Sequence, residues 1–190
     1  MTLRMVKFPL IVLGIVAALF LLVYFGGSNL LPNIAGAPQE STTVPQQGSS
    51  LMGRQAPYFD LPDLSGTHVK STQFARTPIV VVFWSTWNSQ AADQIQILDQ
   101  YIARASTEAR LVPAIAINSQ EERSLVSSFM NRGGYRVQML LDVRGITTGD
   151  YQIKSLPTLY FIDGAGVVRD VYVGVLSEKM LKDRVGQILQ

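Results

Sequence analysis

The nucleophiles of this chain set a narrow limit on the chemistry that it can carry out. Its 190 residues include no cysteine. Thiol–disulfide exchange needs one thiolate that attacks a disulfide sulfur and a second thiol that resolves the mixed disulfide, and no other side chain replaces them. A peroxidase that works through a peroxidatic thiolate is excluded for the same reason. Thiol redox catalysis is therefore not expected of this chain acting alone.

The remaining polar side chains form no catalytic pattern in the sequence. Ser89 has a hydroxyl that would need an adjacent base, whereas the one histidine, His68, falls in an expected surface turn outside this segment. Asp60, Asp63 and Asp93 are scattered and are expected to be solvated. We find no cluster of metal ligands and no phosphate-binding glycine loop in the sequence. The sequence therefore predicts no catalytic residue, no metal site and no cofactor.

The N-terminal residues have the pattern of a membrane anchor. Phe8–Gly27 is a run of twenty residues without a charge, and as a helix it would span about 30 Å, the thickness of the hydrocarbon core. Because Arg4 and Lys7 precede it, we expect a cytoplasmic N-terminus over residues 1–7 and an extracytoplasmic, periplasmic C-terminal domain at the cell membrane. A cleaved signal peptide ending near Ala35-Gly36-Ala37 is the alternative, but the length of the apolar run favours an uncleaved signal anchor.

A linker and one domain follow the anchor. Residues 28–52 are rich in Ser, Pro, Gln, Gly, Thr and Asn, with Glu40 as their only charge, a composition typical of a flexible linker. The folded domain is predicted over residues 53–190. Two of the 16 basic and one of the 14 acidic residues precede Gly53, so this domain is nearly neutral. It has no basic stripe for binding nucleic acid.

Strands and helices alternate along the predicted domain. Strands are predicted at 79–84, 111–117, 137–141, 159–163 and 167–173. Helices are predicted from residue 88 or 89 through 105, from 118–120 to 131 and from 177 to 188, with a short helical turn over 147–153 and a hairpin around 65–66. This order predicts an α/β fold in which a central mixed sheet is covered on both faces.

Apolar spacing predicts which residues of the first strand and helix are buried. Ile79–Trp84 is a continuous β-branched and aromatic run, as expected for a strand buried on both faces. Ile95, Leu98, Ile102 and Ala105 recur at steps of three and four residues, which predicts one apolar helix face.

The other helix signals are local. We expect Leu125 and Phe129 to point inward from the second helix. Either Asn88 or Ser89 is suited to cap the first helix, and Ser177 is suited to cap the last one.

Four segments in order resemble the redoxin domain of membrane-tethered thioredoxin-like proteins of the TlpA/ResA type. These segments are APYFDLPDLSG at 56–66, VVVFWSTW at 80–87, SLPTLYFIDGAG at 155–166 and VGVLSEKML at 173–181. The resemblance covers Gly53–Gln190. It implies a thioredoxin-like three-layer fold with a central mixed β-sheet and an N-terminal hairpin extension, preceded by one transmembrane helix.

The resemblance also implies the place of a site. Asn88 and Ala91 stand where this thiol–disulfide oxidoreductase family has its two cysteines, so the CxxC motif is degenerate. The resemblance implies a cis peptide bond before Pro157 and a peptide-binding groove. The groove residues implied in this way are Trp87, Asn88, Ser89, Leu156, Pro157 and Thr158. Val82 occupies the position at which thioredoxin has a buried carboxylate, which fits a site with no proton to move.

Two residues of this site have alternative interpretations. Asn88 is either a helix cap or, together with Ser89, a polar contact to a bound partner. Trp84 is expected in the core, whereas Trp87 follows the strand at a turn and is the leading candidate for a partner contact.

Three classes of function stay open at this point. The first is a membrane-tethered protein that binds extracytoplasmic polypeptide as an assembly or scaffold factor and is itself redox-inactive. The second is an enzyme with chemistry that uses no thiol, or a component of a thiol–disulfide pathway in which a neighbouring protein supplies the thiols. The third is a structural subunit of a membrane complex whose groove is inert.

Overall fold

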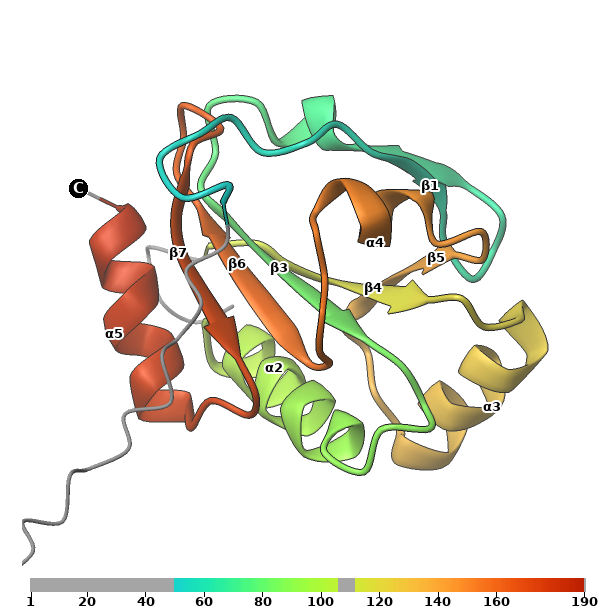
Figure 1. The fold of residues 1–190 in the computed structure, drawn as a ribbon. Coiled ribbons are helices and arrows are strands. Elements are labelled where there is room, and N and C mark those ends of the chain that lie inside the picture. Colours follow the sequence, from blue (N-terminus) through green and yellow to red (C-terminus); the bar gives the residue numbers. More distant parts are fainter. Residues whose placement is uncertain (1–49, 106–111, 190) are drawn as a thin grey trace, which may run out of the picture. The chain divides into compact units, whose positions relative to one another are not determined.

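A computed structural model describes residues 50–105 and 112–189, and its centre is a five-stranded sheet (Figure 1). The order of the strands is β5-β4-β3-β6-β7, in which β3, β4 and β5 are parallel and β6 and β7 are antiparallel to their neighbours. These strands are β3 (Ile79–Trp84), β4 (Ala114–Ser119), β5 (Gln138–Asp142), β6 (Thr158–Ile162) and β7 (Val168–Val173). A separate hairpin pairs β1 (Asp60–Pro62) with β2 (His68–Lys70).

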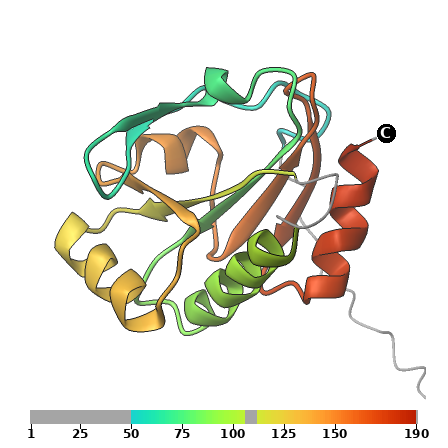
Figure 2. The same ribbon diagram turned by 180° about the vertical axis from the view of Figure 1, so that it is seen from behind.

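Helices cover both faces of this sheet. The helical elements are η1 (Ser71–Phe74), α2 (Ala91–Ala105), α3 (Arg123–Gly133), α4 (Ile146–Asp150) and α5 (Glu178–Ile188). Helices α2, α3 and α5 lie on one side, and α4 lies on the other with the β1–β2 hairpin and η1 (Figures 1 and 2). The predicted three-layer α/β arrangement with a mixed sheet is therefore confirmed.

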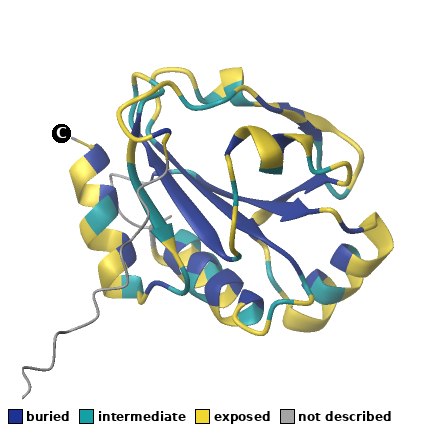
Figure 3. Cartoon of the chain, in the orientation of Figure 1, coloured by how far each residue is buried: buried dark blue, intermediate teal, exposed yellow. Residues whose placement is uncertain are grey.

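The central strand β3 joins the two halves of the core. Side chains alternate across a strand, so Val82 and Trp84 pack against the α2 side, whereas Val81 and Phe83 pack against the hairpin side. All six residues of β3 are buried, and Figure 3 shows the same for most of the sheet, while the outer faces of the helices are exposed. The prediction that Ile79–Trp84 is a strand buried on both faces is confirmed.

Helix α2 packs on the sheet through the face that its sequence predicts. Ile95 and Leu98 are fully buried and Ile102 is half-buried, and Tyr101 joins this face. The Tyr101 hydroxyl donates a hydrogen bond to the Val112 carbonyl oxygen at 3.3 Å.

The prediction for helix α3 is right for Phe129 and wrong for Leu125. Leu125 is 46% exposed, whereas Val126 and Met130 are buried. Phe129 is half-buried, and its ring centroid lies 4.8 Å from that of Trp84. The helix begins at Arg123, later than predicted. The centre of its inner face is formed by Val126 and Met130, each one position after the two residues predicted to point inward. The helix ends at Gly133, and its C-cap Gly134 takes the left-handed conformation with φ 64°.

The last helix has the predicted cap. The Ser177 side chain accepts a hydrogen bond from the Met180 backbone N–H at 3.3 Å. This bond satisfies one of the N–H groups that have no partner within the helix.

The segment that precedes β1 runs beside β7. The Gly53 N–H donates to the Val168 carbonyl and the Ala56 N–H donates to the Gly166 carbonyl, both at 2.9 Å. Leu51 is buried in the same core cluster as Val168, so packed residues begin two positions before the predicted domain start at residue 53.

The predicted anchor over residues 8–27 and almost all of the predicted linker over 28–52 lie outside the described residues. No helix in the described part of the chain is long and apolar enough to cross a membrane. The anchor, the linker and the cytoplasmic N-terminus stay predictions.

The burial of α3 yields a stability prediction. Met130→Ala should lower the free energy of unfolding by about 2–5 kcal/mol, because it leaves a cavity in the core. Leu125→Ala, on the same helix, should change it by less than about 0.5 kcal/mol. Urea unfolding of the full-length chain, followed by tryptophan fluorescence, measures both values. A larger loss for Leu125→Ala than for Met130→Ala would contradict the helix face described here.

Candidate functional site

The loop from β3 to α2 carries three of the predicted groove residues, Trp87, Asn88 and Ser89. It leaves the sheet at Ser85, which is fully buried and whose hydroxyl donates to the Ser119 carbonyl oxygen at 2.9 Å. The chain then turns outward, and the Trp87 side chain is 71% exposed. Ser89 is also exposed, whereas Trp84 at the end of the strand is fully buried. The core and surface positions predicted for the two tryptophans are both observed.

Asn88 uses both of its side-chain polar atoms within the protein. Its Nδ2 donates to the Leu156 carbonyl oxygen at 2.7 Å, and its Oδ1 accepts from the Gln90 N–H at 2.8 Å. The Ala91 N–H donates to the Asn88 carbonyl at 3.0 Å, and Ala91 is the first residue of α2. The helix therefore begins later than a cap at Asn88 or Ser89 would require, and Asn88 stabilises the turn that precedes it.

The segment before β6 lies opposite this loop. The peptide bond between Leu156 and Pro157 is cis, and Pro157 is buried. Thr158 is 3% exposed, and its hydroxyl donates to the Ser155 carbonyl oxygen at 2.6 Å. The Gly174 N–H donates to the Pro157 carbonyl oxygen at 2.8 Å. Of the three residues predicted here, Leu156 is the one that is partly accessible.

A small depression of about 200 Å³ lies between the two segments. Of the predicted groove residues, Trp87 and Leu156 line it, and Asn88, Ser89, Pro157 and Thr158 do not. The other lining residues come from the ends of β3 and β4, from α4 and from the segment before β6: Ser85, Ser119, Gln120, Thr148, Ile153, Lys154 and Ser155. Lys154 is the charged residue of this lining.

A buried carboxylate that the sequence analysis missed holds the Trp87 loop in place. Glu121 is 8% exposed and follows β4. Its Oε2 accepts from the Thr86 N–H at 2.7 Å and from Asn118 Nδ2 at 2.6 Å, and its Oε1 accepts from the Thr86 hydroxyl at 2.6 Å. The position of Glu121 in the sequence could have indicated this role, because residues that follow neighbouring parallel strands meet at one edge of a sheet.

A second buried carboxylate holds Thr148, which lines the depression. Asp142, at the end of β5, is 2% exposed and accepts from the N–H and the hydroxyl of Thr148, both at 2.7 Å. The Thr148 hydroxyl oxygen also lies 3.0 Å from Ser119 Oγ. Gln120 takes the left-handed conformation, with φ 60°, and its N–H donates to the Asp142 backbone carbonyl oxygen at 3.0 Å. Such backbone outliers gather at binding and active sites.

The side chains of this site can make apolar and hydrogen-bonded contacts. Asn88 and Ala91 have no nucleophile, and position 82 is a fully buried valine. His68 lies in β2 with its Nδ1 2.6 Å from Asp60 Oδ1, and it does not line the depression. No group of three or more His, Asp or Glu within residues 50–105 and 112–189 could hold a metal. The site offers an exposed indole and a rigid polar frame.

Comparison with known proteins places these features in a family context. The model of the AhpC/TSA family matches residues 52–171. The thiol:disulfide interchange protein DsbE of Xylella fastidiosa (strain 9a5c) is 24% identical over 184 residues, which cover 95% of this chain and 86% of that protein. The thiol-disulfide oxidoreductase ResA of Bacillus subtilis is 25% identical over 136 residues, which cover 72% and 75% of the two chains.

A solved structure shows the same fold. The crystal structure of a putative thiol:disulfide interchange protein DsbE from Chlorobium tepidum aligns with a TM-score of 0.66 at 23% identity. The match covers 73% of this chain and 98% of that chain. The thioredoxin-like α/β fold inferred from the sequence is confirmed.

The role of Glu121 is testable against its neighbour. Glu121→Gln should lower the free energy of unfolding by about 1–3 kcal/mol, because an amide presents N–H groups where the loop needs acceptors. Glu122→Gln is the matched control, since Glu122 is exposed and its side chain makes no capping bond. It should shift the unfolding free energy by less than about 0.5 kcal/mol. Equal urea midpoints for the two variants would show that Glu121 does not stabilise the loop.

Proposed function

Because the chain belongs to the AhpC/TSA family, we propose that it keeps the polypeptide-binding face of a thioredoxin-like protein and uses it without thiol chemistry. In this proposal the depression beside Trp87 binds an extended segment of an extracytoplasmic polypeptide. The protein acts as a membrane-tethered binding or assembly factor.

The exposure of Trp87 is the observation that carries the proposal. A large aromatic side chain that is 71% exposed leaves apolar surface in contact with water. It stands at the rim of a depression with Leu156 and Ile153 beside it. Tryptophan is enriched among residues that dominate binding energy at interfaces. A partner that covers this indole would bury apolar surface on a loop whose position Glu121 already fixes.

Because it has no cysteine, this chain lacks the thiols needed for the activity after which its relatives are named. DsbE of Xylella fastidiosa is named a thiol:disulfide interchange protein and ResA of Bacillus subtilis a thiol-disulfide oxidoreductase. This chain has Asn88 and Ala91 at the motif positions and no thiol elsewhere. Exchange of a disulfide requires a thiolate, so any redox step at this site would need thiols from another protein.

The contacts of Asn88 favour its structural interpretation over a partner contact. Its amide already occupies the Leu156 carbonyl oxygen, and its Oδ1 already accepts from Gln90. In the proposed complex Asn88 therefore shapes the groove, while Trp87, Leu156 and the exposed Ser89 face the partner. Pro157 and Thr158 support Leu156 from within.

The proposed location follows from the N-terminal sequence. The charge-free run over residues 8–27 after Arg4 and Lys7 supports a single-pass anchor with its N-terminus in the cytoplasm. Residues 28–52 would then tether the binding domain outside the cytoplasm, close to the membrane surface.

Photo-crosslinking in native membranes tests the proposed binding face. A photoreactive residue at Ser89, beside Trp87, should capture a discrete polypeptide, and one at Gln187 on α5 should not. Equal labelling from both positions, or capture from Gln187 alone, would favour a structural subunit with an inert groove.

The contribution of Trp87 can be separated from its effect on folding. Trp87→Ala should reduce capture from Ser89 by about tenfold or more, as expected for the loss of a central aromatic contact. Its unfolding free energy should change by less than about 0.5 kcal/mol, because the side chain is exposed. Tyr58→Ala is the control, since Tyr58 is 55% exposed and lies outside the depression. Unfolding of Trp87→Ala would show that the indole belongs to the core.

Restoring the two sulfurs tests the alignment of the degenerate motif. In the double variant Asn88→Cys, Ala91→Cys, an intramolecular disulfide should form on mild oxidation. The two positions are the first and last residues of the hydrogen-bonded turn that leads into α2. The pair Asn88→Cys, Gln96→Cys is the control, and it should keep free thiols. Mass spectrometry after alkylation measures both. Free thiols in both proteins would count against the alignment.

A further inference from the structure

A second and larger cleft lies at the opposite end of β3 from Trp87. Its volume is about 430 Å³. Three segments form its walls: the lead-in over 55–59, the stretch over 71–79 that contains η1, and the β6–β7 turn over 163–166. Figure 1 shows η1 and the β6–β7 turn together at the top, whereas the loop from β3 to α2 lies at the bottom. Sites for small ligands have volumes of roughly 300–1,000 Å³.

The inner surface of this cleft is aromatic and aliphatic. Phe59, Ile79, Tyr151 and Ile162 are all buried there, and Phe74 is half-buried beside them. Burial raises the pKa of Tyr151, with a smaller contribution from Tyr160. The neutral phenol donates to the Pro57 carbonyl oxygen at 3.0 Å. The inner surface therefore favours a flat apolar group and offers it little charge.

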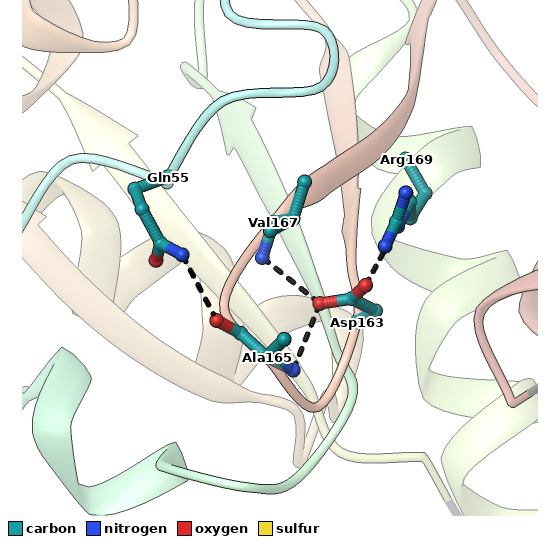
Figure 4. Close-up of polar contacts among 5 residues, drawn as sticks. All are labelled: Gln55, Asp163, Ala165, Val167 and Arg169. Atoms are coloured by element: carbon teal, nitrogen blue, oxygen red, sulfur yellow. Dashed lines mark hydrogen bonds and ion pairs between the residues drawn. The ribbon is translucent and has the colours of Figure 1, made fainter.

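Asp163 is the acidic residue of the lining, and its carboxylate is fully engaged. One oxygen accepts from the N–H groups of Ala165 and Val167 at 2.8 and 2.9 Å, and the other accepts from Arg169 Nε at 2.6 Å (Figure 4). Burial opposes ionisation, but the bonds from Val167, Arg169 and Ala165 outweigh it and hold the pKa of Asp163 below its usual value. Its charge is neutralised by Arg169.

The turn is also fixed against the lead-in. Gln55 Nε2 donates to the Ala165 carbonyl oxygen at 3.2 Å (Figure 4). Gly166 has φ 78°, a conformation that favours glycine, and a Cβ atom there would lie 2.9 Å from Gln55 Oε1. This hydrogen bond fixes the spacing between the lead-in and the β6–β7 turn in the absence of a ligand.

Arg76 is the basic residue of the lining, and it has no ion-pair partner among the described residues. Its backbone takes the left-handed conformation, with φ 64°. A non-glycine residue has a conformational cost there, and such strained residues gather at binding sites. With Asp163 neutralised by Arg169, Arg76 gives the cleft a net positive charge beside an apolar interior.

We propose that this cleft binds a small organic anion with an aromatic body, whose ring system packs on Phe59 and Tyr151 while its anionic group pairs with Arg76. This site is independent of the groove beside Trp87. Its proposed ligand class follows from the apolar inner surface and from the one charge that the protein leaves unpaired there.

A matched pair of probes tests the proposal on the full-length chain. Naphthalene-2-sulfonate carries the anionic group, and naphthalene-2-sulfonamide has nearly the same shape without the charge. Isothermal titration calorimetry should show that the sulfonate binds about tenfold more tightly than the sulfonamide, as expected for one charge-assisted hydrogen bond. Hydrogen exchange should slow on the sulfonate's binding over residues 71–79 and 163–166. Absence of binding at millimolar sulfonate, or protection confined to the Trp87 loop, would overturn the proposal.

Substitutions in the cleft separate charge from shape. Arg76→Gly suits the left-handed backbone, so the fold should persist while sulfonate affinity falls about tenfold and sulfonamide affinity stays unchanged. Thr77→Trp should fill the mouth of the cleft and abolish the binding of both probes. Arg144→Ala, at an exposed arginine outside the cleft, should leave both affinities unchanged. Sulfonate binding that survives Thr77→Trp, or that falls equally in Arg76→Gly and Arg144→Ala, would show that the cleft is not the site.

Discussion

Burial of β3 on both faces is the constraint on which the rest of this structure depends. A strand with no exposed residue needs a packed layer on each side, and the alternation of its side chains assigns Val82 and Trp84 to one layer and Val81 and Phe83 to the other. Its backbone is paired with β4 on one edge and β6 on the other. The depression beside Trp87 and the cleft beside Arg76 therefore lie at opposite ends of this strand, where its buried residues are followed by loops.

The loop at the carboxyl end of β3 is fixed by polar groups that are themselves buried. Glu121 accepts three hydrogen bonds, two of them from Thr86. A buried carboxylate is costly unless hydrogen bonds compensate for the water it loses. Such a group is useful where a loop must present an exposed side chain in one position, as this loop presents Trp87. The frame of a thioredoxin-like site is thus retained in a chain that has no thiol.

Asn88 links the two segments of the site by a hydrogen bond. Its amide donates to the carbonyl oxygen of Leu156, and this contact joins the loop before α2 to the segment before β6. The interaction ties together two parts of the chain that are 68 residues apart. The Asn88 side chain therefore contributes to structure in a chain whose relatives are named for thiol chemistry.

The sequence by itself determined the order of strands and helices, the burial of Ile79–Trp84, the cap at Ser177 and the absence of cysteine. These features depend on local spacing, on capping residues and on composition, all of which are visible along the chain. The sequence analysis placed Leu125 on the inner face of α3, whereas Val126 and Met130 are the residues buried there. Which side of this short helix meets the sheet depends on tertiary packing. Tertiary structure alone decided the contacts of Asn88 with Leu156 and of Glu121 with Thr86, and the cleft beside Arg76. Each of these joins segments far apart in sequence, so strand register and loop path had to be fixed before the partners could meet.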